Sequence, residues 1–312
     1  MNIVLIFLGF FLLLVGGEFI VRSSVALSLK FKISKFIIGM TVVSLATSLP
    51  ELIVSVNAAI NNSPSIAINN VIGSNIANIG LVLGIISILG TISVDNNFYK
   101  RDWPWMFFFS VLIWFFVFQD SVLQNYEGLI LFSILIFFTV SLIKNFDHGD
   151  FNKKVDEKLS DVSNFKILIW LFISSFSLFF GAEFLVDGSI KLAEQINISE
   201  AVISVTIVAI GTSVPELAAS LIAIAKKEEG ISVGNLIGSN IFNIGLVLGI
   251  TSMIKPILVD DEILSRDIIW MLVFALMVIV LAILPQKNQI SKYKGSIMFL
   301  MYIYFIYIAF MQ

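Results

Sequence analysis

The sequence contains no cysteine and only one histidine, which excludes several kinds of site. Disulfides, thiolate metal sites and haem attachment all need cysteines that the chain lacks. The lone histidine, His148, lies in a polar stretch and is expected to be solvated rather than a ligand. The apolar segments contain no paired histidines, no Ser-Lys pair and no Asp-Asp pair, so we expect neither an enzyme nor a bound cofactor.

Charged residues are also scarce, at 13% of the chain against about 25% in an average soluble protein. Hydrophobic residues make up 58%, and the mean hydropathy is +0.99. This composition predicts an integral membrane protein whose surroundings are the lipid bilayer. We expect neither a nucleic acid nor an obligate protein partner. Residues 1–20 lack the positively charged start of a signal peptide, so they are predicted to be a first membrane span.

Apolar segments close to the length of about 20 residues that crosses a bilayer predict an all-α membrane protein. The ten expected transmembrane helices are residues 3–27, 35–61, 66–91, 103–119, 126–144, 166–192, 198–225, 231–254, 268–284 and 296–311. One long polar segment, residues 145–165, carries charges of both signs and is predicted to be a cytoplasmic linker. It separates residues 1–144 from residues 166–312, which gives two halves of five helices each.

The two halves contain the same stretch of sequence. The first copy has Thr47-Ser48-Leu49-Pro50-Glu51 and Gly73-Ser74-Asn75-Ile76-Ala77-Asn78, and the second has Thr212-Ser213-Val214-Pro215-Glu216 and Gly238-Ser239-Asn240-Ile241-Phe242-Asn243. A shift of 165 residues aligns residues 46–85 with 211–250 without a gap, and 22 of the 40 aligned positions are identical. The two halves are therefore predicted to be repeats of one structural unit.

The positions of Lys and Arg predict how the chain crosses the membrane. If the N-terminus is outside, 16 of the 19 Lys and Arg residues fall on the cytoplasmic side. We therefore expect a multi-pass protein of the cell membrane, that is the inner or plasma membrane, with both termini outside. Five spans is an odd number, so the two repeats must run through the membrane in opposite directions. Such inverted-topology repeats are typical of secondary transporters.

Each copy of the motif places a carboxylate beside a proline in the middle of a predicted span. Pro50 and Pro215 remove a backbone donor and are expected to break the helix. The carbonyls that would lose their partners are those of Ser44, Thr47, Ala209 and Thr212. Glu51 and Glu216 follow the prolines, and a carboxylate at that depth predicts a functional site. Two such carboxylates would match one Ca²⁺ or two Na⁺; the alternative is a protonated, hydrogen-bonded core glutamate.

Polar and small residues in the second part of each motif extend the candidate site. Ser74 and Asn78 are four residues apart and share one helical face, as do Ser239 and Asn243. They are candidates to line the same site, with a helix-bridging role as the alternative. The glycines of the motif are expected to let helices approach closely; they are Gly73, Gly80, Gly84, Gly238, Gly245 and Gly249.

These two stretches resemble the paired alpha-repeats of the cation/Ca²⁺ exchanger superfamily, and most closely the prokaryotic Na⁺/Ca²⁺ exchangers. The TSLPE and TSVPE motifs with their GSNIxN partners carry the resemblance, which spans all ten predicted helices. It implies an antiporter in which helices 2, 3, 7 and 8 form a central site of four cation positions and helices 1 and 6 slide past this core. Glu18 and Glu183 lie on those sliding helices. They either line the moving interface or cap helix packing.

Carried over by position, the resemblance implies that Ca²⁺ lies between Glu51 and Glu216, with the carbonyls of Thr47 and Thr212. It implies Na⁺ sites at Thr47, Ser48, Ser74 and the Ser44 carbonyl on one side, and at Thr212, Ser213, Ser239 and the Ala209 carbonyl on the other. Many relatives carry Asp at position 243, whereas Asn78 and Asn243 are both neutral here. This departure limits the charge of the site to that of two glutamates and argues against K⁺ co-transport.

Na⁺ is the expected counter-ion, because H⁺-coupled relatives typically carry Asn where this chain has a Thr-Ser pair. The transported ions, Ca²⁺ and Na⁺, are thus the expected ligands. A Ca²⁺/H⁺ antiporter is the first alternative. A cation channel whose repeats line a continuous pore is the second.

Overall fold

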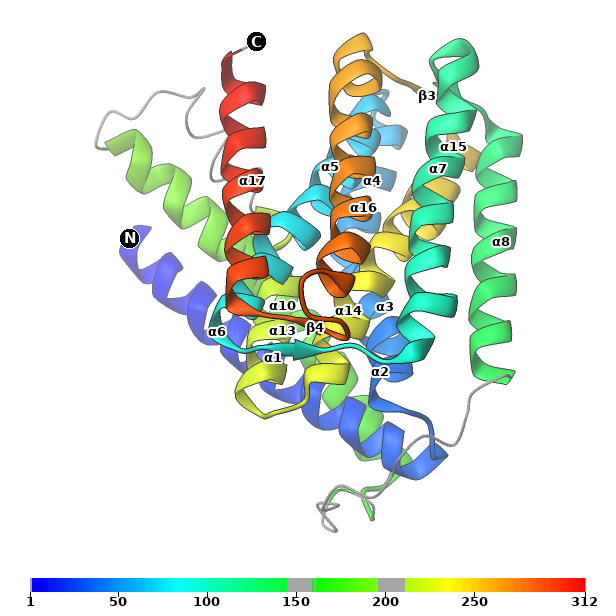
Figure 1. Cartoon of the computed structure of the whole chain (residues 1–312). Coiled ribbons are helices and arrows are strands. Elements are labelled where there is room, and N and C mark those ends of the chain that lie inside the picture. The colour runs from blue at the N-terminus through cyan, green and yellow to red at the C-terminus, as the bar shows by residue number, and fades with distance from the viewer. Residues whose placement is uncertain (1, 145–158, 160, 196–210, 312) are drawn as a thin grey trace. The chain divides into compact units, whose positions relative to one another are not determined.

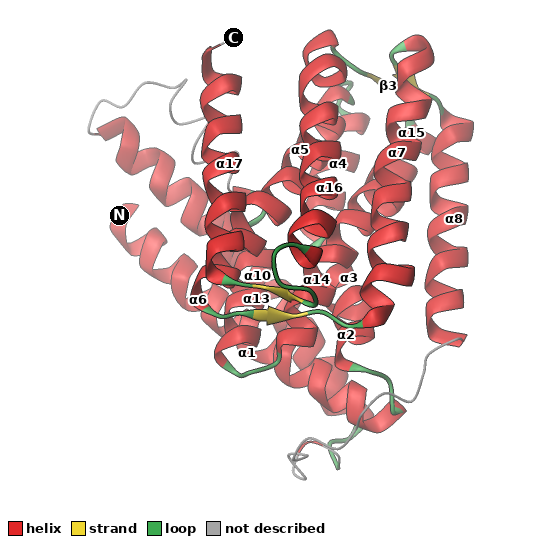
Figure 2. Ribbon diagram, viewed as in Figure 1, coloured by secondary structure: helices red, strands yellow, loops and turns green. Residues whose placement is uncertain are grey.

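The computed structural model describes residues 2–144, 159, 161–195 and 211–311, and most of them are helical (Figure 2). Seven described helices are long and apolar enough to cross a membrane: Asn2–Phe31, Ser65–Leu89, Phe98–Asp120, Asn125–Lys144, Asn164–Gln195, Glu229–Ile254 and Ile263–Ile283. An eighth results if Lys35–Thr47 and Leu49–Ile60 form one broken span. The mostly helical class is confirmed. The count of ten stays a prediction, since residues 196–210 of the seventh expected span lie outside the described part, as does His148.

The chain forms two compact units, and each unit combines segments from both halves of the sequence. The first unit contains Met1–Thr47 and Ser141–Asn235, and the second contains Ser48–Val140 and Leu236–Gln312. Neither unit coincides with a predicted repeat, residues 1–144 or 166–312. The two repeats are defined by similarity of sequence, whereas the two units are defined by contacts in space. The division of the repeats at residues 145–165 stays a prediction.

The first unit is built on two long helices, α1 (Asn2–Phe31) and α10 (Asn164–Gln195), which pack along each other. Its other elements are α2 (Lys35–Ile38), the π-helical turn η1 (Gly39–Val43), α3 (Ser44–Thr47), α13 (Val214–Ala225) and the first part of α14 (Glu229–Phe242). A Cβ atom on Gly9 of α1 would lie 2.8 Å from the carbonyl oxygen of Gly181 on α10. The two backbones can approach this closely only because both residues are glycine.

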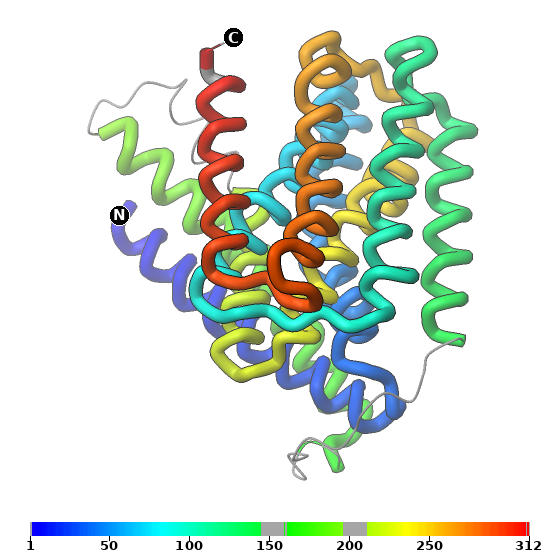
Figure 3. The backbone as a smooth tube through the Cα atoms, in the orientation of Figure 1, coloured from blue at the N-terminus to red at the C-terminus, as the bar shows by residue number. Residues whose placement is uncertain are grey.

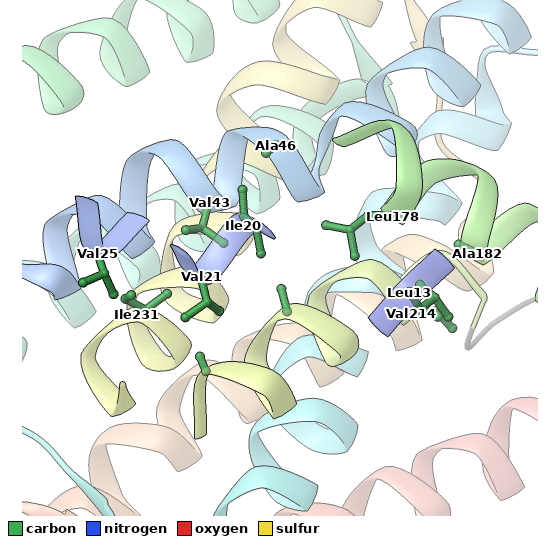
Figure 4. Close-up of a cluster of buried hydrophobic side chains, with 12 residues drawn as sticks. Leu13, Ile20, Val21, Val25, Val43, Ala46, Leu178, Ala182, Val214 and Ile231 are labelled. Atoms are coloured by element: carbon green, nitrogen blue, oxygen red, sulfur yellow. The ribbon is translucent and has the colours of Figure 1, made fainter. Parts of the chain in front are cut away.

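Apolar side chains from these helices form the core of the first unit (Figure 4). Ile20 and Val21 of α1 lie in one buried cluster with Val43, Leu178 and Val214, which come from η1, α10 and α13. The core therefore joins helices from both halves of the sequence, and it fixes where the ends of α3 and α13 lie within this unit.

Ion pairs tie the loop after α13 to the rest of the first unit. Glu18 of α1 accepts hydrogen bonds from Arg22 at 2.5 Å and from Lys226 at 2.7 Å. Lys35 forms an ion pair with Glu228 at 2.6 Å. Glu18 thus binds α1 to the end of α13, which favours its predicted role in capping helix packing.

The second unit contains the remaining helices and the four short strands of the described chain. Its first-half elements are α4 (Leu49–Ile60), α5 (Ser65–Ala77), η2 (Asn78–Leu83), α6 (Gly84–Leu89), β1 (Ile92–Ser93), η3 (Phe98–Asp102), α7 (Trp103–Asp120), β2 (Val122–Leu123) and α8 (Asn125–Lys144), the last of which ends in the first unit. The second-half elements are the end of α14, η5 (Asn243–Leu248), α15 (Gly249–Ile254), β3 (Ile257–Leu258), η6 (Ile263–Asp267), α16 (Ile268–Ile283), β4 (Gln289–Ile290) and α17 (Lys292–Met311). Segments of the two halves interleave: α6 lies against α17 (Figure 3).

The strands, which the sequence did not predict, show how the two halves run within this unit. β1 pairs with β4, and β2 pairs with β3, both antiparallel. β1 and β2 lie at opposite ends of the 23-residue helix Phe98–Asp120, which is about 35 Å long at 1.5 Å per residue. β1 and its repeat equivalent β3 therefore lie at opposite ends of the unit (Figure 1). An inverted repeat requires this arrangement.

Glycines in the second unit mostly have the packing role that the sequence predicts. A Cβ atom on Gly80 would lie 2.8 Å from the ring of Phe274, and one on Gly245 would lie 2.8 Å from Leu135. Gly73 differs, because a Cβ atom there would meet no described atom within 4 Å. No close contact is therefore seen at Gly73 within the described part of the chain, and its packing role stays a prediction.

Candidate cation site

Both proline motifs start a new helix inside an apolar segment. Ser48 has φ −85° and ψ 0°, and Ser213 has φ −91° and ψ 4°, directly before α4 and α13. This backbone lies in the sparsely populated bridge region, so the helix is interrupted at each serine. The proline is the second residue of the new helix, where its missing N–H costs least. The breaks predicted at Pro50 and Pro215 are confirmed.

The two glutamates lie in the first turns that follow these breaks. Glu51 is 1% exposed in α4, and Glu216 is fully buried in α13. The N-terminus of a helix favours a negative charge. A carboxylate removed from water nevertheless needs a compensating positive charge or strong hydrogen bonds. Each break therefore places a buried carboxylate at a point where a cation would stabilise it.

The second unit holds half of the predicted ligands. This group consists of six residues, all at most 1% exposed: Ser48, Glu51, Ser74, Asn78, Ser239 and Asn243. They come from α4, α5, η2, α14 and η5. Of these, α4, α5 and η5 pack against one another. The structure thus brings oxygen-bearing side chains from both repeats into one buried region of this unit.

The first unit holds Ser44, Thr47, Thr212, Ser213 and Glu216. The Thr47 hydroxyl lies 3.4 Å from the Ser44 carbonyl oxygen, one of the carbonyls that the proline was predicted to free. Thr47 also interacts with the Glu216 carboxylate, so a residue of the first motif meets one of the second. Ala209 lies outside the described residues. The convergence of Glu51 and Glu216 on one ion stays a prediction, because the two residues belong to different units.

Several buried oxygens of the site lack a hydrogen-bond donor among the described residues. They are the hydroxyls of Ser48 and Ser213 and the Oδ1 atoms of Asn78 and Asn243. Leaving such an atom unpaired costs about 1–3 kcal/mol. The four positions form two pairs related by the 165-residue shift, and all four atoms are oxygens. Hard cations such as Ca²⁺ bind oxygen ligands of this kind, so a bound cation would supply the missing partner.

The sequence reasoning missed a set of polar residues that support the predicted ligands. Asn235 accepts a hydrogen bond from the Thr47 hydroxyl at 3.1 Å and donates one to Ser220 at 3.2 Å. Asn70 donates to Ser55 at 3.4 Å, and this pair is equivalent to Asn235 and Ser220 after the 165-residue shift. Asn70 and Asn235 are the same residue type in the two copies, as are Ser55 and Ser220. This repetition in the sequence could have identified them as part of the site.

Buried carboxylates and amide oxygens at the breaks of apolar helices are characteristic of membrane ion transporters. The comparison with known proteins identifies the family. The sodium/calcium exchanger protein family matches residues 1–144 and 166–311, so the chain belongs to this family.

Individual relatives match over nearly the whole chain. The sodium/calcium exchanger MaX1 of Methanosarcina acetivorans is 31% identical over 99% of this chain and 98% of its own length. The inner membrane protein YrbG of Escherichia coli is 33% identical over 93% of this chain and 90% of its own length. The solved structure of the sodium-calcium exchanger NCX_Mj superimposes with a TM-score of 0.82 at 32% identity, and the match covers 100% of this chain and 99% of that one.

Proposed function

We propose that this protein is a secondary antiporter that exchanges Na⁺ for Ca²⁺ across the cell membrane by alternating access. The observation that carries the proposal is the buried glutamate that follows a helix break in each of two repeat copies. The similarity to MaX1 and NCX_Mj, which are named as sodium/calcium exchangers, supports the choice of ions.

In this proposal Ca²⁺ and Na⁺ compete for a midplane site built on Glu51 and Glu216. Two carboxylates carry two negative charges, which one Ca²⁺ or two Na⁺ would neutralise, and the amides of Asn78 and Asn243 add none. Ca²⁺ takes six to eight oxygen ligands. The carbonyls of Thr47 and Thr212 would add oxygens to the Ca²⁺ position. The flanking Na⁺ positions would use Thr47, Ser48, Ser74 and the Ser44 carbonyl on one side, and Thr212, Ser213, Ser239 and the Ala209 carbonyl on the other. Competition for the same carboxylates couples the release of one ion to the binding of the other.

Alternating access requires helices that move. We assign this role to α1 and α10, the equivalents of helices 1 and 6 of the sequence prediction. Gly9 of α1 packs closely against the backbone of α10 at Gly181. Small residues allow such close association of two helices, so α1 and α10 would move together as one pair past the helices of the core.

Transport into proteoliposomes tests the proposal. An outward Na⁺ gradient is expected to drive ⁴⁵Ca²⁺ uptake, and Glu51→Gln or Glu216→Gln is expected to abolish it, because either change halves the charge of the site. Glu194→Gln, at an exposed position of α10, is the matched control and should retain uptake.

The same assay separates the alternatives. Uptake that ignores Na⁺ and follows a pH gradient would identify a Ca²⁺/H⁺ antiporter. Ca²⁺ flux that needs no counter-ion would identify a channel. Either result would replace Na⁺/Ca²⁺ exchange as the function.

A further inference from the structure

Four buried asparagines of the second unit form two equivalent hydrogen bonds. Asn243 Nδ2 donates to Asn75 Oδ1, and Asn78 Nδ2 donates to Asn240 Oδ1, each at 3.2 Å. The 165-residue shift relates Asn75 to Asn240 and Asn78 to Asn243, so it converts one bond into the other. Asn75 is 1% exposed and Asn240 is 2% exposed, and neither was among the predicted ligands.

The orientation of the Asn75 amide follows from neighbours that can only accept a hydrogen bond. Its Nδ2 lies 3.2 Å from the main-chain carbonyl oxygen of Asn240 and 3.8 Å from the sulfur of Met271. A carbonyl oxygen and a thioether sulfur have no hydrogen to donate. The NH₂ group of Asn75 must therefore face these atoms, which turns its Oδ1 towards Asn243.

Asn240 is oriented in the equivalent way. Its Nδ2 lies 3.7 Å from the sulfur of Met106, and Met106 is the repeat equivalent of Met271. Its Oδ1 consequently faces Asn78. In both pairs the hydrogen bond therefore runs in the same direction, from the NH₂ group of Asn78 or Asn243 to the Oδ1 atom of Asn240 or Asn75. Neighbouring groups that can only accept hydrogen bonds set this direction.

This direction of the hydrogen bonds decides which amide atom of the two candidate ligands, Asn78 and Asn243, is left to face the site. Asn78 and Asn243 use their NH₂ groups for the bonds to Asn240 and Asn75, so their Oδ1 atoms point elsewhere. Both Oδ1 atoms are buried without a hydrogen-bond partner among the described residues. An amide has nearly the same shape when it is rotated by 180°, but the rotated group would present an NH₂ donor that repels a cation.

We propose that Asn75 and Asn240 are positioning residues that hold the amides of Asn243 and Asn78 with oxygen, and not nitrogen, towards the transported cation. This inference rests on the proposed function. It also explains how a site with neutral amides at both positions presents only oxygens. A carboxylate at position 243 would have an oxygen at either end and would not need to be oriented.

A double-mutant cycle tests this role. Asn75→Ala removes the acceptor that orients Asn243, and it is expected to weaken equilibrium ⁴⁵Ca²⁺ binding to the purified protein about tenfold, the effect of about one hydrogen bond. In the Asn243→Asp background the same change is expected to weaken binding less than about twofold, because orientation no longer matters there. In transport, Asn75→Ala should raise KM for Ca²⁺ and leave kcat nearly unchanged.

Asn125→Ala is the matched control. Asn125 Nδ2 donates to the Ser252 carbonyl oxygen at 2.8 Å and joins α8 to α15. Its loss should lower the Tm without changing Ca²⁺ binding. The equivalent cycle of Asn240→Ala with Asn78→Asp keeps the test open if the first variant does not fold.

The outcomes separate this inference from the proposed function. Equal weakening in both backgrounds, or no weakening in either, would overturn the positioning role even if Na⁺/Ca²⁺ exchange is observed. A wild-type protein that binds Ca²⁺ and shows the expected cycle, but does not exchange it for Na⁺, would retain the positioning role and reject the function. Absence of Ca²⁺ binding to the wild-type protein would overturn both.

Discussion

Ser48 and Ser213 bury hydroxyl oxygens that have no hydrogen-bond partner among the described residues. In a purely structural role such a group is unfavourable, by about 1–3 kcal/mol. As a ligand of a transported cation, the same group gains its partner when the ion binds. Removing the hydroxyl should therefore not lower stability in the absence of the ion, but it should weaken the binding of the ion.

We therefore expect Ser48→Ala and Ser213→Ala to separate stability from transport. The free energy of unfolding without Na⁺ or Ca²⁺ should be unchanged or raised by up to about 1 kcal/mol, since an unpaired buried group is removed. The Na⁺ concentration for half-maximal exchange should rise several-fold. Thermal unfolding and ⁴⁵Ca²⁺ exchange measure the two effects. Ser133→Ala, at an exposed serine of α8, should change neither, and lost stability with unchanged Na⁺ dependence would assign the hydroxyls to the fold.

At the scale of elements, the repeat is visible in irregular turns as well as in the helices. The π-helical turns η2 and η5 begin at Asn78 and Asn243 and are related by the 165-residue shift. The helix before Asn78 is α-helical from Ser65 to Ala77, so the predicted common face of Ser74 and Asn78 is consistent with this geometry. The π turn then changes the spacing, which a search for a period of 3.6 residues cannot detect.

Contacts between elements also indicate at which glycines an added side chain would disturb the packing of helices. A Cβ atom on Gly128 of α8 would lie 2.6 Å from the carbonyl oxygen of Gly249 on α15 and would overlap the Ser252 hydroxyl. A Cβ atom on Gly73 would meet nothing described within 4 Å. The same substitution should therefore have opposite effects at these two helical positions.

We expect Gly128→Ala to lower the free energy of unfolding by about 1–3 kcal/mol, because the two backbones must separate. Gly73→Ala should raise it by about 0.5–1 kcal/mol through its higher helix propensity. Thermal unfolding followed by tryptophan fluorescence compares the two variants with the wild type. Equal destabilisation by both substitutions would contradict the conclusion that Gly128 is closely packed and Gly73 is not.

At the scale of the whole molecule, the strand pairs agree with the orientation predicted from charge. β1 and β4 lie in loops that were both predicted to be cytoplasmic, and β2 and β3 lie in loops that were both predicted to be external. In the first unit, the ion pair between Lys35 and Glu228 likewise joins two predicted cytoplasmic loops. Which end faces the cytoplasm stays a prediction, since the pairs fix only which loops share an end.

The absence of cysteine makes this orientation directly testable. Asn96 and Asp261 are exposed, and the 165-residue shift relates them. An impermeant maleimide applied to intact cells is expected to label the Asp261→Cys variant, and to label Asn96→Cys only after permeabilisation. We expect this labelling pattern because loops rich in Lys and Arg stay on the cytoplasmic side of the membrane. Labelling of both variants from the same side would reject the inverted topology, and the reversed pattern would place both termini inside.

The sequence alone was sufficient for features that depend on local chemistry. Long apolar runs predict helices because backbone groups in lipid must be satisfied within the segment. Pro50 and Pro215 predict breaks because a proline lacks its own N–H. The repeated motif identifies Glu51 and Glu216 because both copies are present in the chain.

Which residues of the two repeats contact each other depends on the three-dimensional packing, and the sequence does not predict it. A shift of 165 residues shows that Asn75 is equivalent to Asn240, but it does not show that Asn75 instead contacts Asn243, 168 residues away. The same is true of β1, which is equivalent to β3 and pairs with β4. Equivalence is a property of the sequence, whereas contact depends on how distant segments pack, and packing selects the atom that each buried amide presents.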